Sequence, residues 1–303
     1  MVSEPDRSIG FVETHYHVWE LGRLRYAWLD EPGTEAMTAR LGDYRALRED
    51  WGPARLAAAF EGSNVVGAVH VEADQSGPDP VAETAWLATI ARAWGMPNAI
   101  VAHADLERDG VEETLDRHVA ASDLVRGIRI REHPADPTSA TFRRALHAMA
   151  ERGLSYDMNA SIDRLASGRT TALAHADLSV ILCHTGYPPR RDAETFSTWR
   201  RQMSALAEAP NVACKISGLG MADHTWTVES IRPWVLAAIE AFGVERCLFA
   251  TNWPVDSLYG TYRRQVDAYR RIIADAGFTS DEQHALLHRN AERLYRLTPS
   301  PAP

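Results

Sequence analysis

The 303-residue sequence has few cysteines and no apolar run long enough to span a bilayer. Its three cysteines, Cys183, Cys214 and Cys247, fit a reducing compartment better than a disulfide framework. The first residues are polar and lack the apolar core of a secretion signal. We therefore expect a cytoplasmic protein that does not insert into a membrane.

Lysine is nearly absent as well. The sequence has 32 basic residues, and Lys215 is the only lysine among them. The net charge of −9 argues against nucleic acid or an anionic membrane surface as a partner. Chance alone could leave one lysine, but a lysine is a compact point charge that an arginine does not replace at a tight site. We favour a role for Lys215 in a binding site.

A Gly-rich phosphate-binding turn is also missing after the early strand-like segments, which argues against an open doubly wound sheet. What repeats instead is a short apolar run followed by a helical stretch. The strand-like runs are 11–18, 64–72, 98–104, 124–131, 153–158, 178–184, 211–217 and 246–252. The helical stretches include 81–94, 110–121, 140–152, 192–209, 228–242 and 262–276. This alternation predicts an α/β fold, a (β/α)8 TIM barrel.

We expect residues 1–303 to form a single barrel domain, since an apolar content of 45% can build a full core. A segment at about 21–62, with several Trp, Tyr and Arg residues, follows the first strand as an insertion. Loops after barrel strands lie over the active-site mouth, and we expect the insertion there. A final amphipathic helix is expected at about 280–297.

Polar residues gather at the ends of the expected strands, where barrel enzymes carry their active residues. They are His15, His17, Glu72, His103, Arg129, Arg131, Asp157, His184, Lys215 and Asn252. His15 and His17 are two residues apart and project from the same side of a strand, as two ligands of one metal ion would. Each could instead hydrogen-bond buried backbone. Because His184 ends a distant strand, we favour a shared site for the three.

Alternation along the strands makes further predictions. Arg129 and Arg131 point to the same side, and two buried guanidinium groups need anionic partners. Those partners are either Glu72 and Asp157 or a substrate carboxylate, and the sequence leaves both open. If His184 points inward, so do Val180 and Leu182, whereas Cys183 faces the helices. The same count turns Cys214 and Cys247 outward, so that all three cysteines are expected to be packing residues.

Six motifs come in one order along the chain: His15-Tyr-His-Val-Trp19, Val69-His-Val-Glu-Ala73, Val125-Arg-Gly-Ile-Arg129, Leu182-Cys-His-Thr-Gly-Tyr-Pro188, Cys214-Lys-Ile-Ser-Gly-Leu219 and Leu248-Phe-Ala-Thr-Asn-Trp-Pro-Val-Asp256. With them the chain resembles the amidohydrolase superfamily. The similarity is to the amidohydrolase-related branch that contains sugar-lactone and 2-pyrone-4,6-dicarboxylate lactonases, and it covers essentially the whole chain.

The resemblance implies a (β/α)8 barrel and hydrolysis of a cyclic ester, and the cationic residues at the strand ends lead us to expect a small, anionic one. The histidines that surround the substrate carbonyl in such lactonases correspond to His15, His17 and His184. Some relatives bind a divalent metal such as Zn²⁺ there and others work without one, and we slightly favour operation without metal. The superfamily's histidine on the fifth strand is absent from this chain. On the eighth strand Asn252 takes the place of the aspartate expected as base, and an amide cannot accept a proton at neutral pH.

We therefore expect His15, His17, His184, Asn252 and Asp256 to be the catalytic residues. The base for the attacking water is left open between Asp256, Asp157, Glu72 and a neutral histidine. The expected substrate-binding residues are Glu72, Arg129, Arg131, Asp157 and Lys215, with Trp19 and Tyr187 from the motifs. The partner is a small-molecule substrate, and a homodimer is the default assembly. Two rival functions are a decarboxylase or lyase on the same barrel and a non-catalytic ligand-binding barrel.

Overall fold

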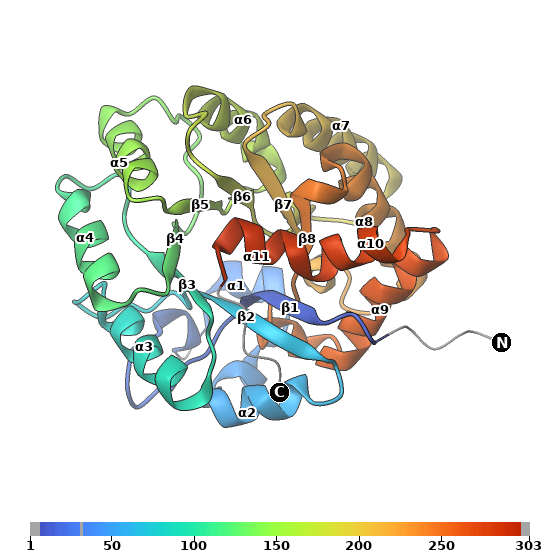
Figure 1. Cartoon of the computed structure of the whole chain (residues 1–303), viewed down its shortest axis with the longest axis horizontal. Helices are drawn as coiled ribbons and strands as arrows, with labels where there is room; N and C mark the ends of the chain where they lie inside the picture. Colours follow the sequence, from blue (N-terminus) through green and yellow to red (C-terminus); the bar gives the residue numbers. More distant parts are fainter. Residues whose placement is uncertain (1–6, 31–32, 298–303) are drawn as a thin grey trace.

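The computed structural model describes residues 7–30 and 33–297, and Figure 1 shows strands alternating with helices around a barrel. The sheet has eight strands in the order β1 to β8, each parallel to the next. This confirms the TIM barrel predicted from the sequence. The ends of the expected domain, 1–6 and 298–303, and residues 31–32 of the expected insertion lie outside the described residues.

Each strand falls within a segment that the sequence predicts. The strands are β1 Phe11–Tyr16, β2 Val65–Val71, β3 Ala99–His103, β4 Val125–Arg129, β5 Ser155–Met158, β6 Val180–Leu182, β7 Val212–Ile216 and β8 Cys247–Phe249. The ring closes beyond β8, where a parallel bridge joins Tyr16 to Trp253. There the backbone N–H of Asn252 donates to the carbonyl of His15 at 2.9 Å. The last strand thus places Asn252 beside the histidines of the first.

The helices that cover the barrel are α3 Ala82–Trp94, α4 Val111–Ala121, α5 Ala140–Glu151, α6 Leu165–Ala174, α7 Ala193–Ala207, α8 Val228–Phe242 and α9 Tyr262–Asp275. Helix α6 was not among the expected helical stretches. Its sequence, LASGRTTALA, spreads small and apolar residues around the whole helix, so no apolar stripe marks it. None of the helices in the described part of the chain is long and apolar enough to span a membrane.

The final helical stretch forms where it was expected, but it also contributes a side chain to the barrel interior, which the sequence did not predict. It consists of α10 Ser280–His284, a π-helical turn at Ala285–Arg289 and α11 Asn290–Tyr295. Figure 1 shows α10 and α11 crossing the near end of the barrel, while the fainter α1 lies at the far end. From α11 the ring of Tyr295 enters the interior and packs with the apolar cluster of inward-facing strand residues, Val69, Val71, Ala99, Val101, Ile181, Ala213 and Leu248. Tyr295 therefore fills the base of the barrel.

A buried ion pair lies above this tyrosine. Lys215 on β7 donates to Asp157 on β5 at 2.6 Å, and neither side chain is exposed to solvent. The Tyr295 hydroxyl donates to the same carboxylate oxygen at 2.6 Å. The Ser155 hydroxyl donates to the other oxygen at 2.9 Å. Burial of charges is tolerated here because the carboxylate has three donors.

The alternation expected for β6 is wrong. Ile181 packs with the interior cluster, whereas Val180 and Leu182 pack with the helices. Cys183 consequently faces the interior, where Lys215 and Asp157 act on its pKa, although burial is what raises it most, to about 11. His184 still reaches the barrel mouth, because its backbone leaves the extended region with φ of 50°. Cys214 and Cys247 pack outward as expected.

The segment between β1 and β2 is anchored firmly to the barrel. It contains α1 Glu35–Leu41, α2 Pro53–Phe60 and two short 3₁₀ turns, Ala27–Leu29 and Arg45–Leu47. The Trp28 indole donates to the carbonyl of Ala73 at 2.9 Å, and the Tyr259 hydroxyl donates to the carbonyl of Leu41 at 3.0 Å. These bonds hold the segment at the C-terminal end of the strands.

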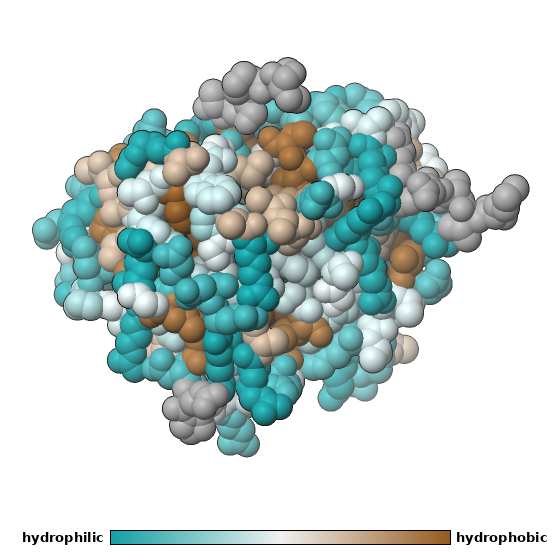
Figure 2. Space-filling model, turned by 90° about the horizontal axis from the view of Figure 1, so that it is seen from below, coloured by the Kyte–Doolittle hydropathy of each residue, from teal (hydrophilic) through white to brown (hydrophobic). Residues whose placement is uncertain are grey.

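The outer surface shows no extended apolar face in the view of Figure 2, where hydrophilic residues separate small hydrophobic patches. Large apolar side chains that are exposed are scattered over several elements: Leu21, Val66, Trp94, Val119 and Leu173. Isolated apolar residues of this kind are normal for a protein surface. The apolar side chains are otherwise concentrated in the barrel interior and under the helices.

The buried ion pair generates a stability prediction. Lys215→Met leaves the Asp157 carboxylate charged and unpaired in the interior, and we expect the free energy of unfolding in urea to fall by about 3–5 kcal/mol. Adding Asp157→Asn to that variant is expected to restore most of the loss, because no charge is left uncompensated. Arg169→Met, which breaks an exposed pair with Glu208, is the control and should cost less than about 1 kcal/mol. An equal loss in the single and double Lys215 variants would contradict this account.

Candidate functional site

A cavity of about 260 Å³ opens at the C-terminal ends of the strands. The residues that line it are His17, Trp28, Met37, Arg40, Leu41, Glu72, Ala73, Asp74, Arg129, Arg131, Asn159, His184, Tyr187, Met221, Asn252 and Val255. Eight strands end near this mouth, which explains why polar residues distant in sequence share it. Of the expected site residues, the cavity brings together His17, His184, Asn252, Glu72, Arg129, Arg131 and Tyr187.

The three expected histidines meet beneath and around this cavity. The ring centre of His15 is 4.2 Å from that of His184 and 5.1 Å from that of His17. All three side chains are buried. His15 lies below the lining, and His17 and His184 reach the cavity itself. The convergence predicted from two strand ends is therefore present in the structure.

Hydrogen bonds set the protonation of two of these rings. The Nδ1 of His17 lies 2.8 Å from the carbonyl of Val71, which can only accept, so this nitrogen carries the proton. In the neutral ring the Nε2 of His17 is then an acceptor. The Nε2 of His15 lies 3.2 Å from Nη1 of Arg129, and a guanidinium can only donate. His15 therefore accepts through Nε2 and carries its proton on Nδ1.

The imidazoles are neutral over the physiological pH range. Burial lowers the pKa of His17 to about 4, with the Arg129 charge adding to the effect. Burial also holds the pKa of His15 and His184 well below the usual value, and neighbouring cationic groups act in the same direction. A neutral imidazole can take a proton or donate a hydrogen bond, so these rings keep both options at pH 7.

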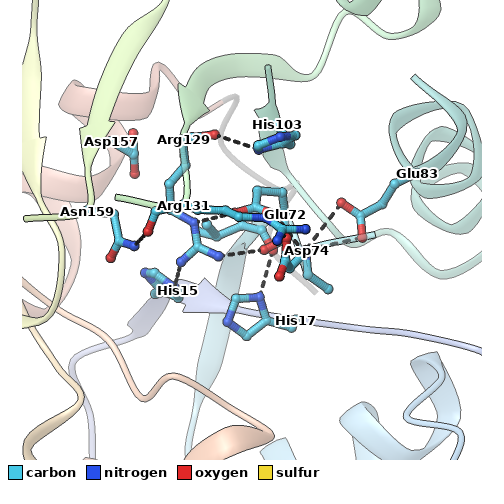
Figure 3. A network of polar contacts seen from close by, with 12 residues as sticks. His15, His17, Glu72, Asp74, Glu83, His103, Arg129, Arg131, Asp157 and Asn159 are labelled. Atoms are coloured by element: carbon cyan, nitrogen blue, oxygen red, sulfur yellow. Dashed lines mark hydrogen bonds and ion pairs between the residues drawn. The ribbon is translucent and has the colours of Figure 1, made fainter. Parts of the chain in front are cut away.

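Arg129 is held by the end of β2. Its Nε donates to Glu72 Oε1 at 2.6 Å and its Nη2 donates to the Glu72 carbonyl at 2.8 Å, as Figure 3 shows. Although burial opposes it, the Arg129 charge keeps the pKa of Glu72 below its usual value. Glu72 is thus the internal partner that the sequence left open for this arginine.

Arg131 does not pair with Asp157, which was one of the acidic partners expected for the two arginines. Arg131 pairs with Asp74 at 2.6 Å. Asp157 pairs with Lys215 deep in the barrel, and Figure 3 shows it standing apart from the Arg129–Glu72 contact. Neither Asp157 nor Lys215 is among the residues that line the cavity. Asp157 instead accepts hydrogen bonds from Lys215, Tyr295 and Ser155.

Asn252 and Asp256 form one unit at the eighth strand. The Asn252 amide donates through Nδ2 to Asp256 Oδ1 at 2.8 Å, and Nδ2 also lies 3.8 Å from the sulfur of Met221. These contacts use the amide hydrogens and leave Oδ1 as an acceptor. The Asn252 backbone has φ of 60°, a conformation that asparagine tolerates better than most residues. Asp256 lies behind Asn252 and does not line the cavity.

Asp256 is fully buried, and its surroundings change its acidity. Burial raises the pKa of Asp256 to about 7, although hydrogen bonds from Asn252 and Gln265 favour the carboxylate. The Gln265 amide donates to the second oxygen at 3.3 Å. A carboxyl group with this pKa changes its protonation state close to neutral pH.

Sequence reasoning missed four polar or adaptable lining residues: Arg40, Asp74, Asn159 and Met221. Asn159 follows Asp157 by two positions, so strand alternation could have identified it. Arg40 comes from α1, inside the insertion, where no periodic signal points to the cavity. Trp19 shows the opposite error, because it is fully buried, donates to the carbonyl of Glu49 at 2.8 Å and supports the insertion.

The donor atoms of this site do not form a metal-binding set. In the described residues, 7–30 and 33–297, no three His, Cys, Asp or Glu side chains are arranged to hold a metal ion. The Nε2 of His15 accepts from the guanidinium of Arg129, which occupies the lone pair that a metal would need. An amide at Asn252 is also a weaker ligand than a carboxylate. We therefore derive no chemical step through a metal.

Comparison with known proteins gives the context for this geometry. Residues 12–297 match the model of a family described as amidohydrolase. The protein y4mH of Sinorhizobium fredii, itself uncharacterized, is 36% identical over 301 residues, or 95% of this chain and 99% of that protein. An L-fucono-1,5-lactonase of Burkholderia multivorans is 26% identical over 307 residues, or 96% of this chain and 97% of that protein. The crystal structure of an amidohydrolase from B. multivorans with bound zinc has a TM-score of 0.80 at 26% identity, covering 95% of this chain and 100% of that one.

The pKa of Asp256 generates a prediction for stability against pH. A folded-state pKa of about 7, above the ordinary 3.8, means that the folded protein holds a proton that the unfolded chain has released between these values. Stability from this group is therefore fully present below about pH 4 and is lost as pH rises to about 7. We expect Asp256→Asn to flatten the fall in unfolding free energy between pH 4 and 7, measured by urea unfolding. Asp109→Asn, at a side chain that is 90% exposed, is the control and should leave the slope unchanged.

Proposed function

The chain belongs to the amidohydrolase family, and from this premise we propose that it is a hydrolase that opens a small cyclic ester. The single observation that carries the proposal is the convergence of His17, His184, Asn252 and Arg129 on one cavity. An L-fucono-1,5-lactonase that is similar over nearly the whole chain supports a lactone as the substrate. The cavity volume of about 260 Å³ suits a single ring.

The attacking water is proposed to lie in the cavity against both Asn252 and His17, which line it together. Oδ1 of Asn252 and Nε2 of His17 are both acceptors, so a water molecule in contact with the two donates one hydrogen to each. Asn252 orients this water and His17 takes its proton as the oxygen attacks the carbonyl carbon. The bond between this carbon and the ring oxygen then breaks, and the proton held by His17 passes to the ring oxygen, which leaves as a hydroxyl group. Asp256 positions the amide of Asn252 and is not itself in contact with the cavity.

The developing negative charge on the lactone oxygen is proposed to be stabilised by Arg129 and His184. Arg129 lines the cavity and is fixed by Glu72, so its charge does not need to reorient during the reaction. His184 also lines the cavity, and its Nδ1 is 2.8 Å from the Ser217 hydroxyl. A fixed cation and a fixed imidazole at a developing oxyanion are the kind of preorganised stabilisation that lowers the barrier to acyl transfer.

We further propose that the reaction does not depend on a resident metal. A zinc ion is bound in the similar amidohydrolase of B. multivorans, whereas here Arg129 supplies the positive charge that contacts His15. A guanidinium at this position repels a second cation. The protein is also proposed to be cytoplasmic, because its three cysteines are unpaired thiols.

Labelled water tests the reaction class. We expect turnover of aldono-1,4- and 1,5-lactones or carboxylated pyrones in H₂¹⁸O to place one ¹⁸O in the product carboxylate, since hydrolysis transfers the water oxygen to the acyl carbon. Mass spectrometry of the product provides the measurement. Product that lacks the label would favour a decarboxylase or lyase. A lactone that raises the melting temperature without being turned over would favour a binding protein.

Replacement of the proposed base tests the mechanism. We expect His17→Gln to lower kcat by about 100-fold or more, because a positioned general base contributes on that order. His147→Gln, at an exposed histidine on α5, is the matched control and should keep full activity. Elemental analysis of the purified wild type and both variants is expected to find far less than one metal ion per chain. One tightly bound zinc per chain in the wild type, lost in His17→Gln, would instead make His17 a ligand.

A further inference from the structure

The cations of the cavity differ in whether they already have an acidic partner. Arg129 pairs with Glu72 and Arg131 with Asp74, each at 2.6 Å. Lys215 lies below the cavity floor and pairs with Asp157. An arginine with an internal carboxylate partner has part of its charge and several of its donors already satisfied. These three residues are therefore poor candidates for the main recognition of a charged substrate group.

Arg40 is the exception among the cavity-lining cations of the described residues. It lies in the last turn of α1, and none of the described carboxylates is within ion-pairing distance of it. Its guanidinium stacks over the ring of Tyr187, 4.3 Å from the ring centre. Arg40 lines the inner cavity together with His184 and Asn252, and its charge acts on the pKa of His184 and Asp256. Arg40 thus brings an uncompensated positive charge to the mouth.

A second cavity adjoins the first at this arginine. It has a volume of about 470 Å³ and shares Arg40, Arg131, Asn159, Tyr187 and Met221 with the inner cavity. Arg40 and Tyr187 therefore stand where the two cavities join. A ring held against His17 and His184 in the inner cavity would direct a substituent past Arg40 into the outer one.

We propose that Arg40 binds an anionic group of the substrate, a carboxylate or a phosphate, at the junction of the two cavities. The inference rests on the proposed lactone-opening function and identifies the substrate as a ring that carries a negatively charged substituent. Arginine presents planar donors that match either anion with two parallel hydrogen bonds. Stacking on Tyr187 holds the guanidinium in place before the substrate arrives, which reduces the entropy that binding would cost.

A merely structural role for Arg40 makes a different prediction. If Arg40 only fastens α1 to the barrel through Tyr187, its loss would affect charged and neutral ligands alike. The insertion has other anchors, Trp28 to Ala73 and Tyr259 to Leu41, so α1 remains attached when Arg40 is replaced. The two roles can therefore be separated by the charge of the ligand.

Binding of simple anions tests the proposal independently of catalysis. Glutarate and inorganic phosphate are titrated by calorimetry into the wild type, Arg40→Gln, Arg40→Lys and Arg45→Gln. Arg45 is the matched control, because it is an exposed arginine of the same insertion whose partner is Asp43. We expect Arg40→Gln to lower the affinity for the anion that binds by about 10- to 100-fold, which is what one charged hydrogen-bonding group contributes. Arg40→Lys should keep part of the wild-type affinity, and Arg45→Gln should keep all of it.

The preferred anion identifies the substituent, glutarate indicating a carboxylate and phosphate a phosphate. Equal binding by wild type and Arg40→Gln, or no binding of either anion to the wild type, would overturn the proposal. Kinetics separate it from the proposed function: in Arg40→Gln, KM should rise for a carboxylated lactone and stay unchanged for its methyl ester. Turnover of both by the variant with equal KM shifts would retain the hydrolase and reject the role of Arg40.

Discussion

The buried guanidinium of Arg129 is the contact on which the arrangement of the site depends. It joins the ends of three strands, since it donates to Glu72 after β2 and to His15 on β1 while itself ending β4. A charge without partners at this depth would cost several kcal/mol, so its donors must be matched one by one. These hydrogen bonds also determine the tautomer of a neighbouring histidine. Because Arg129 can only donate, it fixes which nitrogen of His15 carries the proton and removes the other from metal binding.

The sequence was sufficient to predict the barrel and the histidine cluster. Each strand lies within an expected run, because short β-branched segments between helices leave few other arrangements. The pair at His15 and His17 and the distant His184 meet as expected. Such predictions succeed where a residue's direction follows from regular strand geometry. For Arg129 the sequence predicted only that a buried charge needs an anionic partner, and the pairing with Glu72 is one of the alternatives that it left open.

Predictions failed where the backbone departs from regular geometry or where a partner comes from far along the chain. The inward and outward positions on β6 were counted back from His184. That residue has φ of 50° and does not continue the strand, so the count was off by one and Cys183 faces inward where it was expected to face outward. Lys215 and Asp157 were expected to bind substrate because strand alternation places them inside the barrel. Alternation does not say how deep a residue lies, and the two form an ion pair that is buried and does not line the cavity. Arg40 could not be found at all, because an irregular insertion carries it to the cavity.

The tyrosine at the base of the barrel has a consequence for how the protein is made. Tyr295 belongs to α11, but its ring packs against strand residues from as early in the chain as Val69. The barrel interior therefore stays incomplete, with Asp157 lacking one of its donors, until the chain has been synthesised as far as Tyr295. Completion of the native core is for this reason a late event, which needs all eight strands and the helix that follows them, whatever helices or strand pairs form earlier.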